Sequence, residues 1–233
     1  MPMDSTPEQT ATPAVAPASE FLRKFTVMTF ATPVLSYPWP DSDALNAELR
    51  SLILAQEKKS AGIVKSNAGG WHSDLGLFKW DAACVRTLQE RARIACVEMT
   101  RNIVMRPNAR FTATYLIDGW ANVVRSGDYH IVHNHPNNLW SGVYYVALGE
   151  PEPDHPHNGQ LELLDPRQAP NMVMIPDSLF ELRYTVRPTE GLMVVFPSWL
   201  RHFVHPYYGS GERISVAFNV LLTDFKFADN AQA

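Results

Sequence analysis

The spacing of short apolar runs in the second half of the chain is the feature that most limits its fold. From Phe111 to Leu222 the sequence breaks into β-type runs separated by Gly, Pro, Asn and Asp, without helical periodicity. The runs fall at about 111–124, 128–134, 141–148, 159–164, 179–187, 191–196, 201–205 and 212–222. Strands this close together favour an antiparallel sandwich or jelly roll over βαβ units, so a mainly β fold is predicted.

Two helices are predicted before this strand-rich half, at about 43–58 and 82–104. Each carries an apolar stripe at helical spacing. Acidic residues at Asp41–Asp43 and at Asp81 stand where helix caps are expected. The helices should pack on the outside of one sheet and cover a face that would otherwise contact water.

These elements predict a single domain over residues 21–225. It divides into an N-terminal strand and helical elaboration at 21–107 and a β core at 108–225. Residues 1–20, rich in Pro, Ala, Thr and Ser, are expected to be a disordered tail, and 226–233 a second tail. The N-terminal strand is expected within a β-rich stretch that ends near Tyr37.

Composition and cysteine placement indicate the environment of the chain. The formal charge is -4 and the sequence pI about 6.0, so no electrostatic footprint for nucleic acid is present. Cys84 and Cys96 lie in one predicted helix about 18 Å apart, beyond the reach of a disulfide. The start of the chain lacks a signal-like apolar region, and no run has membrane-spanning length. The cytoplasm is the expected location.

Histidines in the strand-rich half form a candidate metal site. His133 and His135 are two residues apart on a predicted strand, so both imidazoles point to one face and can converge on one ion. His202, at the start of a later strand, is the best candidate for a third ligand. Imidazole suits iron, zinc, copper and nickel, so the ligand type does not name the metal. The alternative is that His133 and His135 are an ordinary surface pair.

Other residues near this pattern are expected to be bystanders. His130 is out of phase with His133, so on a regular strand it faces the opposite side. His155 and His157 lie in a Pro- and acid-rich loop and are expected to be exposed. Trp199 is expected to pack beneath His202.

A candidate anion site follows on the last apolar strand. Arg213 comes eleven residues after His202, and Ser215 shares its face by alternation. A guanidinium beside a hydroxyl suits a terminal carboxylate. A buried arginine among Val, Ile and Phe is costly without an anion. The alternative is a structural salt bridge, for example to Asp165.

The order of these motifs resembles the Fe(II)/2-oxoglutarate-dependent dioxygenases. More narrowly, roughly residues 23–222 are similar to the 2OG-Fe(II) oxygenase family of bacteria and phages. The motifs that carry this likeness are Ser66–Ser73, His133-Asn-His135, Ser141–Tyr145, Asp165-Pro-Arg167, Phe196–His202, Val204-x-Pro206 and Arg213–Asn219. The resemblance implies a double-stranded β-helix (cupin-like) core and Fe(II). It also implies oxidative decarboxylation of 2-oxoglutarate to succinate and CO2, with hydroxylation of a substrate C–H bond as the default outcome.

The resemblance also implies roles for individual residues. His133 and His202 fill iron-ligand positions, and Arg213 and Ser215 fill the positions that hold 2-oxoglutarate. His135 stands where the wider superfamily has Asp or Glu. Three neutral imidazoles leave the iron site one negative charge short, which raises its reduction potential.

Two further sets of site residues are expected. A carboxylate such as Asp165 or Glu162 is the alternative to His135 as the third ligand. Asn122 and Tyr145, on predicted core strands, are candidates to donate hydrogen bonds to 2-oxoglutarate. Candidate substrate contacts in loops near the strand ends are Trp71, His72, Asn137, Trp140 and Arg201.

The expected partners are O2 and a small-molecule or amino-acid-like substrate, without nucleic acid or membrane. A homodimer through the outer helices is a further option. Two other functions are compatible with the motifs. One is a three-His cupin-type iron dioxygenase that needs no 2-oxoglutarate, and the other is a non-catalytic metal- or ligand-binding barrel.

Overall fold

The computed structural model describes residues 28–106, 108–168, 172 and 180–228. The chain divides into two compact units, Met1–Ala31 and Thr32–Ala233, and all the elements below belong to the second. Of the expected N-terminal β-rich stretch, Leu35–Pro38 form β1, residues 28–34 form no strand, and residues 21–27 lie outside the described residues. The predicted tail at 1–20 and the end of the second tail lie outside the described residues.

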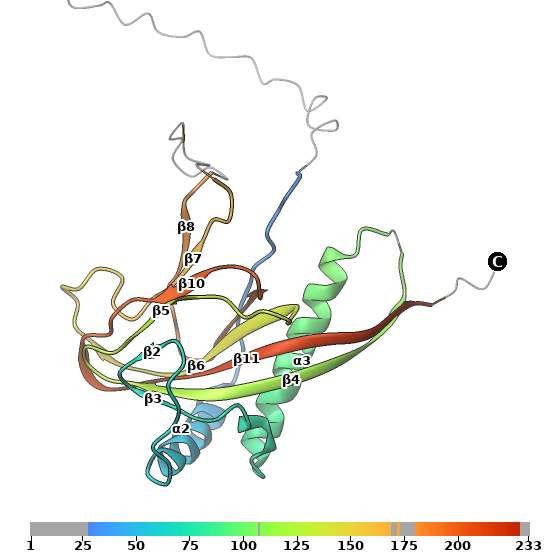
Figure 1. Cartoon of the computed structure of the whole chain (residues 1–233). Coiled ribbons are helices and arrows are strands. Elements are labelled where there is room, and N and C mark those ends of the chain that lie inside the picture. Colours follow the sequence, from blue (N-terminus) through green and yellow to red (C-terminus); the bar gives the residue numbers. More distant parts are fainter. Residues whose placement is uncertain (1–27, 107, 169–171, 173–179, 229–233) are drawn as a thin grey trace, which may run out of the picture. The chain divides into compact units, whose positions relative to one another are not determined.

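Two antiparallel sheets form the second unit (Figure 1). The large sheet has the order β1-β9-β6-β11-β4-β3, and the small sheet the order β2-β5-β10-β7-β8. The remaining large-sheet strands are β3 (Trp71–His72), β4 (Phe111–Val124), β6 (Trp140–Pro151), β9 (Leu192–Pro197) and β11 (Gly209–Phe227). The small-sheet strands are β2 (Asn67–Ala68), β5 (Tyr129–His133), β7 (Leu161–Leu164), β8 (Arg183–Val186) and β10 (His202–Val204). The mainly β prediction is confirmed.

Helices α2 (Asp43–Glu57) and α3 (Ala83–Ile103) cover one face of the large sheet, together with the short 3-10 helix η1 (Leu77–Lys79) (Figure 1). Their buried stripes pack with the sheet into one apolar core, in which Leu49 and Leu88 lie with Phe218. The predicted placement of the helices on one sheet is confirmed. Among the described helices, none is both long and apolar enough to cross a membrane.

The predicted carboxylate caps do not form. Ser42 occupies the N-cap of α2, but its hydroxyl donates to the carbonyl of Trp39 and accepts no bond from an N–H of the helix. Helix α3 begins after Ala82, and Asp81 pairs with Arg86. Burial of the apolar stripes therefore contributes more to these helices than side-chain capping does.

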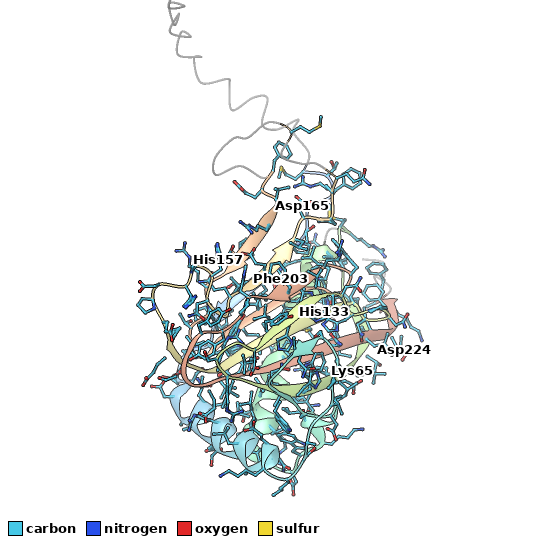
Figure 2. The ribbon with its side chains drawn as sticks, turned by 60° about the vertical axis from the view of Figure 1, so that its left-hand side comes forward. Lys65, His133, His157, Asp165, Phe203 and Asp224 are labelled. Carbon is cyan, nitrogen blue, oxygen red and sulfur yellow. The ribbon has the colours of Figure 1, made fainter. Side chains whose placement is uncertain are left out.

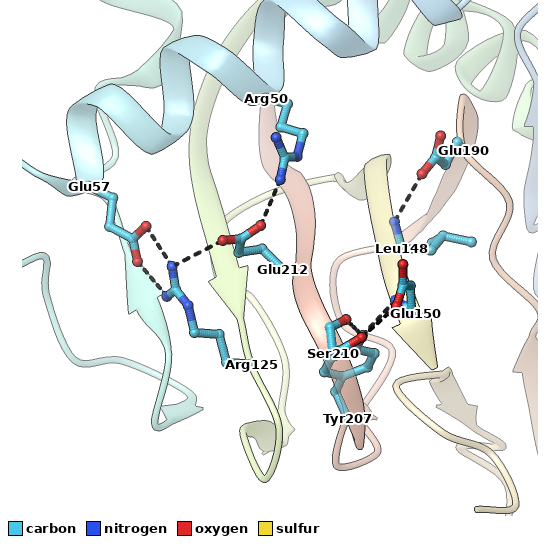
Figure 3. Close-up of polar contacts among 9 residues, drawn as sticks. All are labelled: Arg50, Glu57, Arg125, Leu148, Glu150, Glu190, Tyr207, Ser210 and Glu212. Atoms are coloured by element: carbon cyan, nitrogen blue, oxygen red, sulfur yellow. Dashed lines mark hydrogen bonds and ion pairs between the residues drawn. The ribbon is translucent and has the colours of Figure 1, made fainter. Parts of the chain in front are cut away.

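Ion pairs join α2 to the strand ends of the large sheet (Figure 3). Arg50 lies 2.7 Å from Glu212, and Glu57 accepts two bonds from Arg125 at 2.7 and 3.0 Å. Pairs this accessible to solvent contribute only about 0–1 kcal/mol each. They fix how the helix lies on the sheet more than they stabilise the fold.

Alternation along β11 gives the large sheet two different faces. Ile214 and Val216 point towards the helices and belong to the apolar core. Arg213, Ser215 and Ala217 point the other way and line a cavity whose opposite wall is the small sheet. The regular strand thus places a polar row in the space between the sheets.

Candidate active site

Three imidazoles converge where β5 ends and β10 begins. His133 and His202 lie opposite each other in the antiparallel register, with ring centroids 4.3 Å apart. His135 follows just beyond the end of β5, held by a bond from its backbone N–H to the carbonyl of Ser198 at 3.0 Å. The candidate ligand atoms of the three side chains all lie within 4.8 Å of one another. The structure thus brings together the three histidines chosen from the sequence.

Backbone carbonyls fix the orientation of two of these rings. Nδ1 of His133 lies 2.7 Å from the carbonyl of Ile131, and Nδ1 of His202 lies 2.9 Å from the carbonyl of Leu200. Because a carbonyl only accepts, each Nδ1 carries the proton. Each Nε2 is then unprotonated and can give its lone pair to a metal, the arrangement found in metal-binding histidines.

Burial keeps the three imidazoles neutral. Desolvation lowers the pKa of His202 to about 3 and that of His135 to about 4, and it lowers the pKa of His133 as well. At neutral pH the nitrogen lone pairs are therefore available without the loss of a proton.

The carboxylates considered as replacements for His135 lie elsewhere. Asp165 is engaged by Arg167, with Nε of Arg167 at 3.0 Å from Oδ1. Glu162 points to the other face of the small sheet, where it contacts His205. Within the described ranges, the convergent cluster contains histidines alone.

A β-bulge changes the expected position of His130. Along the β5–β10 pair, His133 is opposite His202 but His130 is opposite Val204, so β5 carries one extra residue. Ile131 and Val132 both lie exposed, and His130 is buried in the cavity lining. The prediction that His130 faces away from His133 is therefore wrong, because strand alternation is broken between them.

Arg213 lies on the opposite wall of the cavity. It is buried, and desolvation lowers its pKa. Its guanidinium lies over the ring of Tyr145 at 5.3 Å, and Nε has no hydrogen-bond partner among the described residues. The alternative of a salt bridge to Asp165 is wrong, since that carboxylate pairs with Arg167. A buried guanidinium in this state is costly unless an anion compensates its charge.

The other residues expected to hold 2-oxoglutarate lie beside Arg213. Ser215 is opposite Asn122 on β4 and opposite Tyr145 on β6. Oδ1 of Asn122 is buried without a partner in the described part of the chain. Arg213, Ser215, Asn122 and Tyr145 therefore form one patch across three adjacent strands.

The cavity between the sheets has further walls that the sequence reasoning missed. Residues that complete its lining are Ser66, Trp120, His130, Ser141, Gly142, Val143, Leu161, Phe196, Val204 and Ala217. The alternation of side chains along a strand could have predicted Trp120 and Ala217, because each lies two residues from a predicted site residue, Asn122 or Ser215. Trp120 lies against His135, with ring centroids 5.6 Å apart.

The residues predicted to contact substrate lie in three different settings. Trp71 and Trp140 belong to the apolar core on the helix side, and Nε1 of Trp140 donates to Thr100. His72 is buried and stacks on Trp120, with ring centroids 5.5 Å apart. Asn137 and Arg201 are exposed and are not part of the cavity lining. His72 is thus the member of this set that touches a cavity residue.

Trp199 lies in the turn between β9 and β10, and the structure overturns its expected packing role. Its side chain is 52% exposed, and the neighbouring Leu200 is buried instead. The residue that contacts the ring of His202 is Phe196, at a centroid distance of 4.8 Å.

Comparisons with known proteins agree with this arrangement. Residues 118–219 match the family model described as "Putative 2OG-Fe(II) oxygenase". This span contains all three convergent histidines and Arg213. No match was found among curated proteins.

Solved structures share the fold at low sequence identity. A Pseudomonas putida prolyl-4-hydroxylase is 18% identical, with 83% of this chain and 93% of that chain covered and a TM-score of 0.50. A Trichoplax adhaerens prolyl hydroxylase in complex with a peptide is 14% identical, with 81% and 83% covered and a TM-score of 0.55. HygX from Streptomyces hygroscopicus, with nickel and 2-oxoglutarate bound, is 14% identical, with 83% and 84% covered and a TM-score of 0.56. The double-stranded β-helix fold is confirmed.

Proposed function

Because residues 118–219 match the model of the 2OG-Fe(II) oxygenase family, we propose that the chain is a Fe(II)- and 2-oxoglutarate-dependent dioxygenase that hydroxylates a C–H bond. The observation that carries the proposal is one cavity with three neutral imidazoles on one wall and a buried arginine without an acidic partner, among the described residues, on the other. The substrate is proposed to be a small molecule or an amino-acid-like compound.

The donor set fits iron. His133, His135 and His202 provide three neutral nitrogen ligands. The hydrogen bonds from Nδ1 of His133 and of His202 to backbone carbonyls hold these two rings with Nε2 free to bind a metal. Nitrogen donors alone also suit zinc, copper and nickel. The selection of iron rests on the family and on the arginine patch that faces the histidines.

The opposite wall fits 2-oxoglutarate. Arg213 holds the far carboxylate through charge-assisted bonds, and the hydroxyl of Ser215 provides a neutral donor. This ligand would remove the cost of burying an uncompensated guanidinium. The side-chain NH2 group of Asn122, which lies opposite Ser215, is proposed to donate a hydrogen bond to the cosubstrate. Tyr145 supports the guanidinium with the face of its ring.

The reaction converts 2-oxoglutarate, O2 and a substrate C–H bond into succinate, CO2 and a C–OH group, and iron with bound 2-oxoglutarate supplies the oxidising chemistry. The residues of the chain bind and orient the reactants. Arg213 sets the direction in which the cosubstrate extends from the three histidines. The apolar walls formed by Phe196, Leu161 and Val204 exclude water from the reacting centre.

The imidazole of His135 gives the proposed metal site a different charge from a site with a carboxylate ligand. His135 brings no negative charge, whereas a carboxylate at this position would bring one. With three neutral ligands, the charge of the metal is balanced by the cosubstrate and not by the protein. The site is therefore proposed to bind iron more weakly alone than in the presence of 2-oxoglutarate.

The proposed substrate class is supported by charge and by the cavity. The formal charge of -4 offers no basic face for a nucleic acid. Solved structures with this fold include a prolyl hydroxylase in complex with a peptide and HygX with hygromycin B bound, so proteins of this fold bind both peptides and small molecules. Two buried free cysteines, Cys84 and Cys96, support the proposed cytoplasmic location.

Succinate formation tests the proposal. The protein is incubated aerobically with Fe(II) and 2-oxoglutarate, and succinate is followed by NMR while candidate amino acids and small metabolites are added. Succinate that depends on both iron and 2-oxoglutarate, and that rises with one substrate class, supports the function. Oxygen uptake without 2-oxoglutarate would support a three-His dioxygenase instead, and metal binding with no turnover would support a non-catalytic barrel.

A further inference from the structure

We propose a second metal site, for a divalent transition metal such as Zn²⁺, formed by His157, Glu162 and His205 on the outer face of the small sheet. The candidate ligand atoms of these residues all lie within 4.8 Å of one another. Leu161 and Leu163 flank Glu162 and belong to the inner core, so alternation turns Glu162 to the face opposite the cavity. Figure 2 labels His157 well away from His133. The site is independent of the proposed catalytic function.

The carboxylate of Glu162 is the observation that points to a cation. Its side chain is fully buried, with 0% exposure. Oε1 accepts a hydrogen bond from Thr185 at 2.8 Å and lies 3.2 Å from Nε2 of His205. Oε2 has no hydrogen-bond partner among the described residues, and no described Lys or Arg pairs with this carboxylate. A buried carboxylate with one unsatisfied oxygen is costly unless a cation compensates it.

The distances suit a tetrahedral metal. Metal–ligand bonds of about 2.0–2.1 Å place neighbouring ligand atoms of a tetrahedron about 3.3 Å apart. Oε1 of Glu162 lies 3.2 Å from Nε2 of His205 and 3.8 Å from Nδ1 of His157. The two imidazole rings stack at 5.1 Å with an interplanar angle of 21°. A hydrogen bond from His205 would account for Oε1, and Nδ1 of His157 lies 3.4 Å from Oε1 of Gln160, but neither contact provides a partner for Oε2 of Glu162.

Solvent exposure of the three side chains increases with their distance from the sheet. The side chain of Glu162 is closed off, that of His205 is 20% exposed and that of His157 is 41% exposed. An ion can therefore enter from solvent past His157 and reach the buried carboxylate. Two histidines and one carboxylate leave a fourth position for water, a common arrangement for zinc.

The loop that carries His157 is held in place from its other side. The side chain of Asn158 donates to the carbonyl of Tyr208 at 2.6 Å and accepts from its N–H at 2.8 Å. Gly159 follows at φ +61, and a Cβ at this position would lie 3.1 Å from Cδ of Arg213. The histidine is therefore presented to Glu162 by a loop that packs behind Arg213. Metal at this site would stabilise that loop on the small sheet.

Zinc titration of a protein without the cavity histidines tests the site. In the His133→Ala/His202→Ala background, one equivalent of Zn²⁺ is expected to bind, measured by calorimetry, and to raise the unfolding temperature. Addition of His157→Ala is expected to weaken this binding more than tenfold. His155→Ala is the matched control, because His155 is exposed in the same loop beside Glu152 and lies outside the cluster; its effect should be less than twofold.

Failure of the site is distinguishable from failure of the catalytic function. Absence of Zn²⁺ binding in a background that keeps its β-sheet circular dichroism would overturn the second site, as would equal binding with and without His157. An independent measurement uses the wild-type protein: crystals soaked in Zn²⁺ should show an anomalous peak between His157, Glu162 and His205. A missing peak there, with a peak at the cavity histidines, contradicts the second site and leaves the proposed dioxygenase intact.

Discussion

The two walls of the cavity are built in different ways. The large sheet contributes β11, which pairs with β4 in unbroken register from Arg213 to Thr223 and is backed by two helices, and it carries Arg213 and Ser215, which are proposed to bind an anion. The small sheet contributes strands of two to five residues, one of them bulged, and it carries the histidines for a metal. The comparison teaches that regular alternation suits a row of cosubstrate contacts. Convergence of the three rings depends instead on the pairing of His133 with His202 and on the end of β5 just before His135.

The two walls also differ in charge. The small-sheet wall presents imidazoles that burial keeps neutral, and the large-sheet wall presents a buried cation. Neither wall contributes a negative charge from a described residue. A dianionic ligand that bridges from the metal to Arg213 would complement both walls at once, which is why their functions are proposed to be coupled.

The largest effect is expected on the small-sheet wall. His202→Ala should reduce Fe(II) affinity by more than about a hundredfold, because loss of a direct ligand exceeds the 10–100-fold cost of removing a partner behind it. The measurement is anaerobic competition with a chelator. His155→Ala, an exposed histidine outside the cavity, is the control. An equal loss of Fe(II) affinity in the two variants would show that His202 is not an iron ligand.

The next effect is expected on the large-sheet wall. Arg213→Ala should weaken 2-oxoglutarate binding by well over tenfold while Fe(II) affinity changes little, because a desolvated charged pair is worth several kcal/mol when broken. Anaerobic calorimetry measures both affinities. Arg125→Ala removes an arginine that is paired with Glu57 at the surface and should leave both unchanged. Unchanged 2-oxoglutarate affinity in Arg213→Ala would refute the assigned role.

A smaller effect is expected for the hydroxyl beside Arg213. Ser215→Ala removes one neutral hydrogen bond, worth about 0.5–1.5 kcal/mol, so 2-oxoglutarate affinity should fall about two- to tenfold. The same titration reports it. A loss as large as that of Arg213→Ala would mean that the hydroxyl and not the guanidinium anchors the cosubstrate.

The smallest effect is expected from pH. Three ordinary imidazoles with a pKa near 6.5 would lose about a thousandfold in metal affinity between pH 7.5 and 5.5, since each must release a proton. Burial lowers the pKa of His202 to about 3 and that of His135 to about 4, so these two stay unprotonated in this window, and it also lowers the pKa of His133 below its ordinary value. Fe(II) affinity should then fall by less than about tenfold. A thousandfold loss of Fe(II) affinity would contradict this expectation, because it would show that the three imidazoles titrate like solvent-accessible ones.

The same difference between the walls explains what the sequence could predict. Strand alternation placed Arg213 and Ser215 on one face correctly, because β11 is regular where they lie. It also found His133 and His202, whose spacing and order are visible in the chain. Glycine, proline and polar breaks located the strands from β4 onwards, since turns need these residues wherever they occur. The short strands β2 and β3 lie in a turn-rich segment and were not predicted.

Alternation failed where tertiary contacts change the backbone. The extra residue in β5 turns His130 into the cavity, and nothing in the local sequence marks this bulge. Trp199 is exposed because its turn places Leu200 inside instead. The cluster of His157, Glu162 and His205 joins a loop to two strands that become neighbours only in the folded sheet. Such long-range pairings have no periodic signal along the chain.

An anaerobic titration of the wild-type protein with Fe(II) and 2-oxoglutarate tests the central claim most directly. A visible charge-transfer band should develop with one equivalent of each, and Arg213→Ala should need well over tenfold more 2-oxoglutarate to reach half of its intensity. No band in the wild type, or the same half-saturation in both proteins, would contradict the claim that both walls hold one cosubstrate.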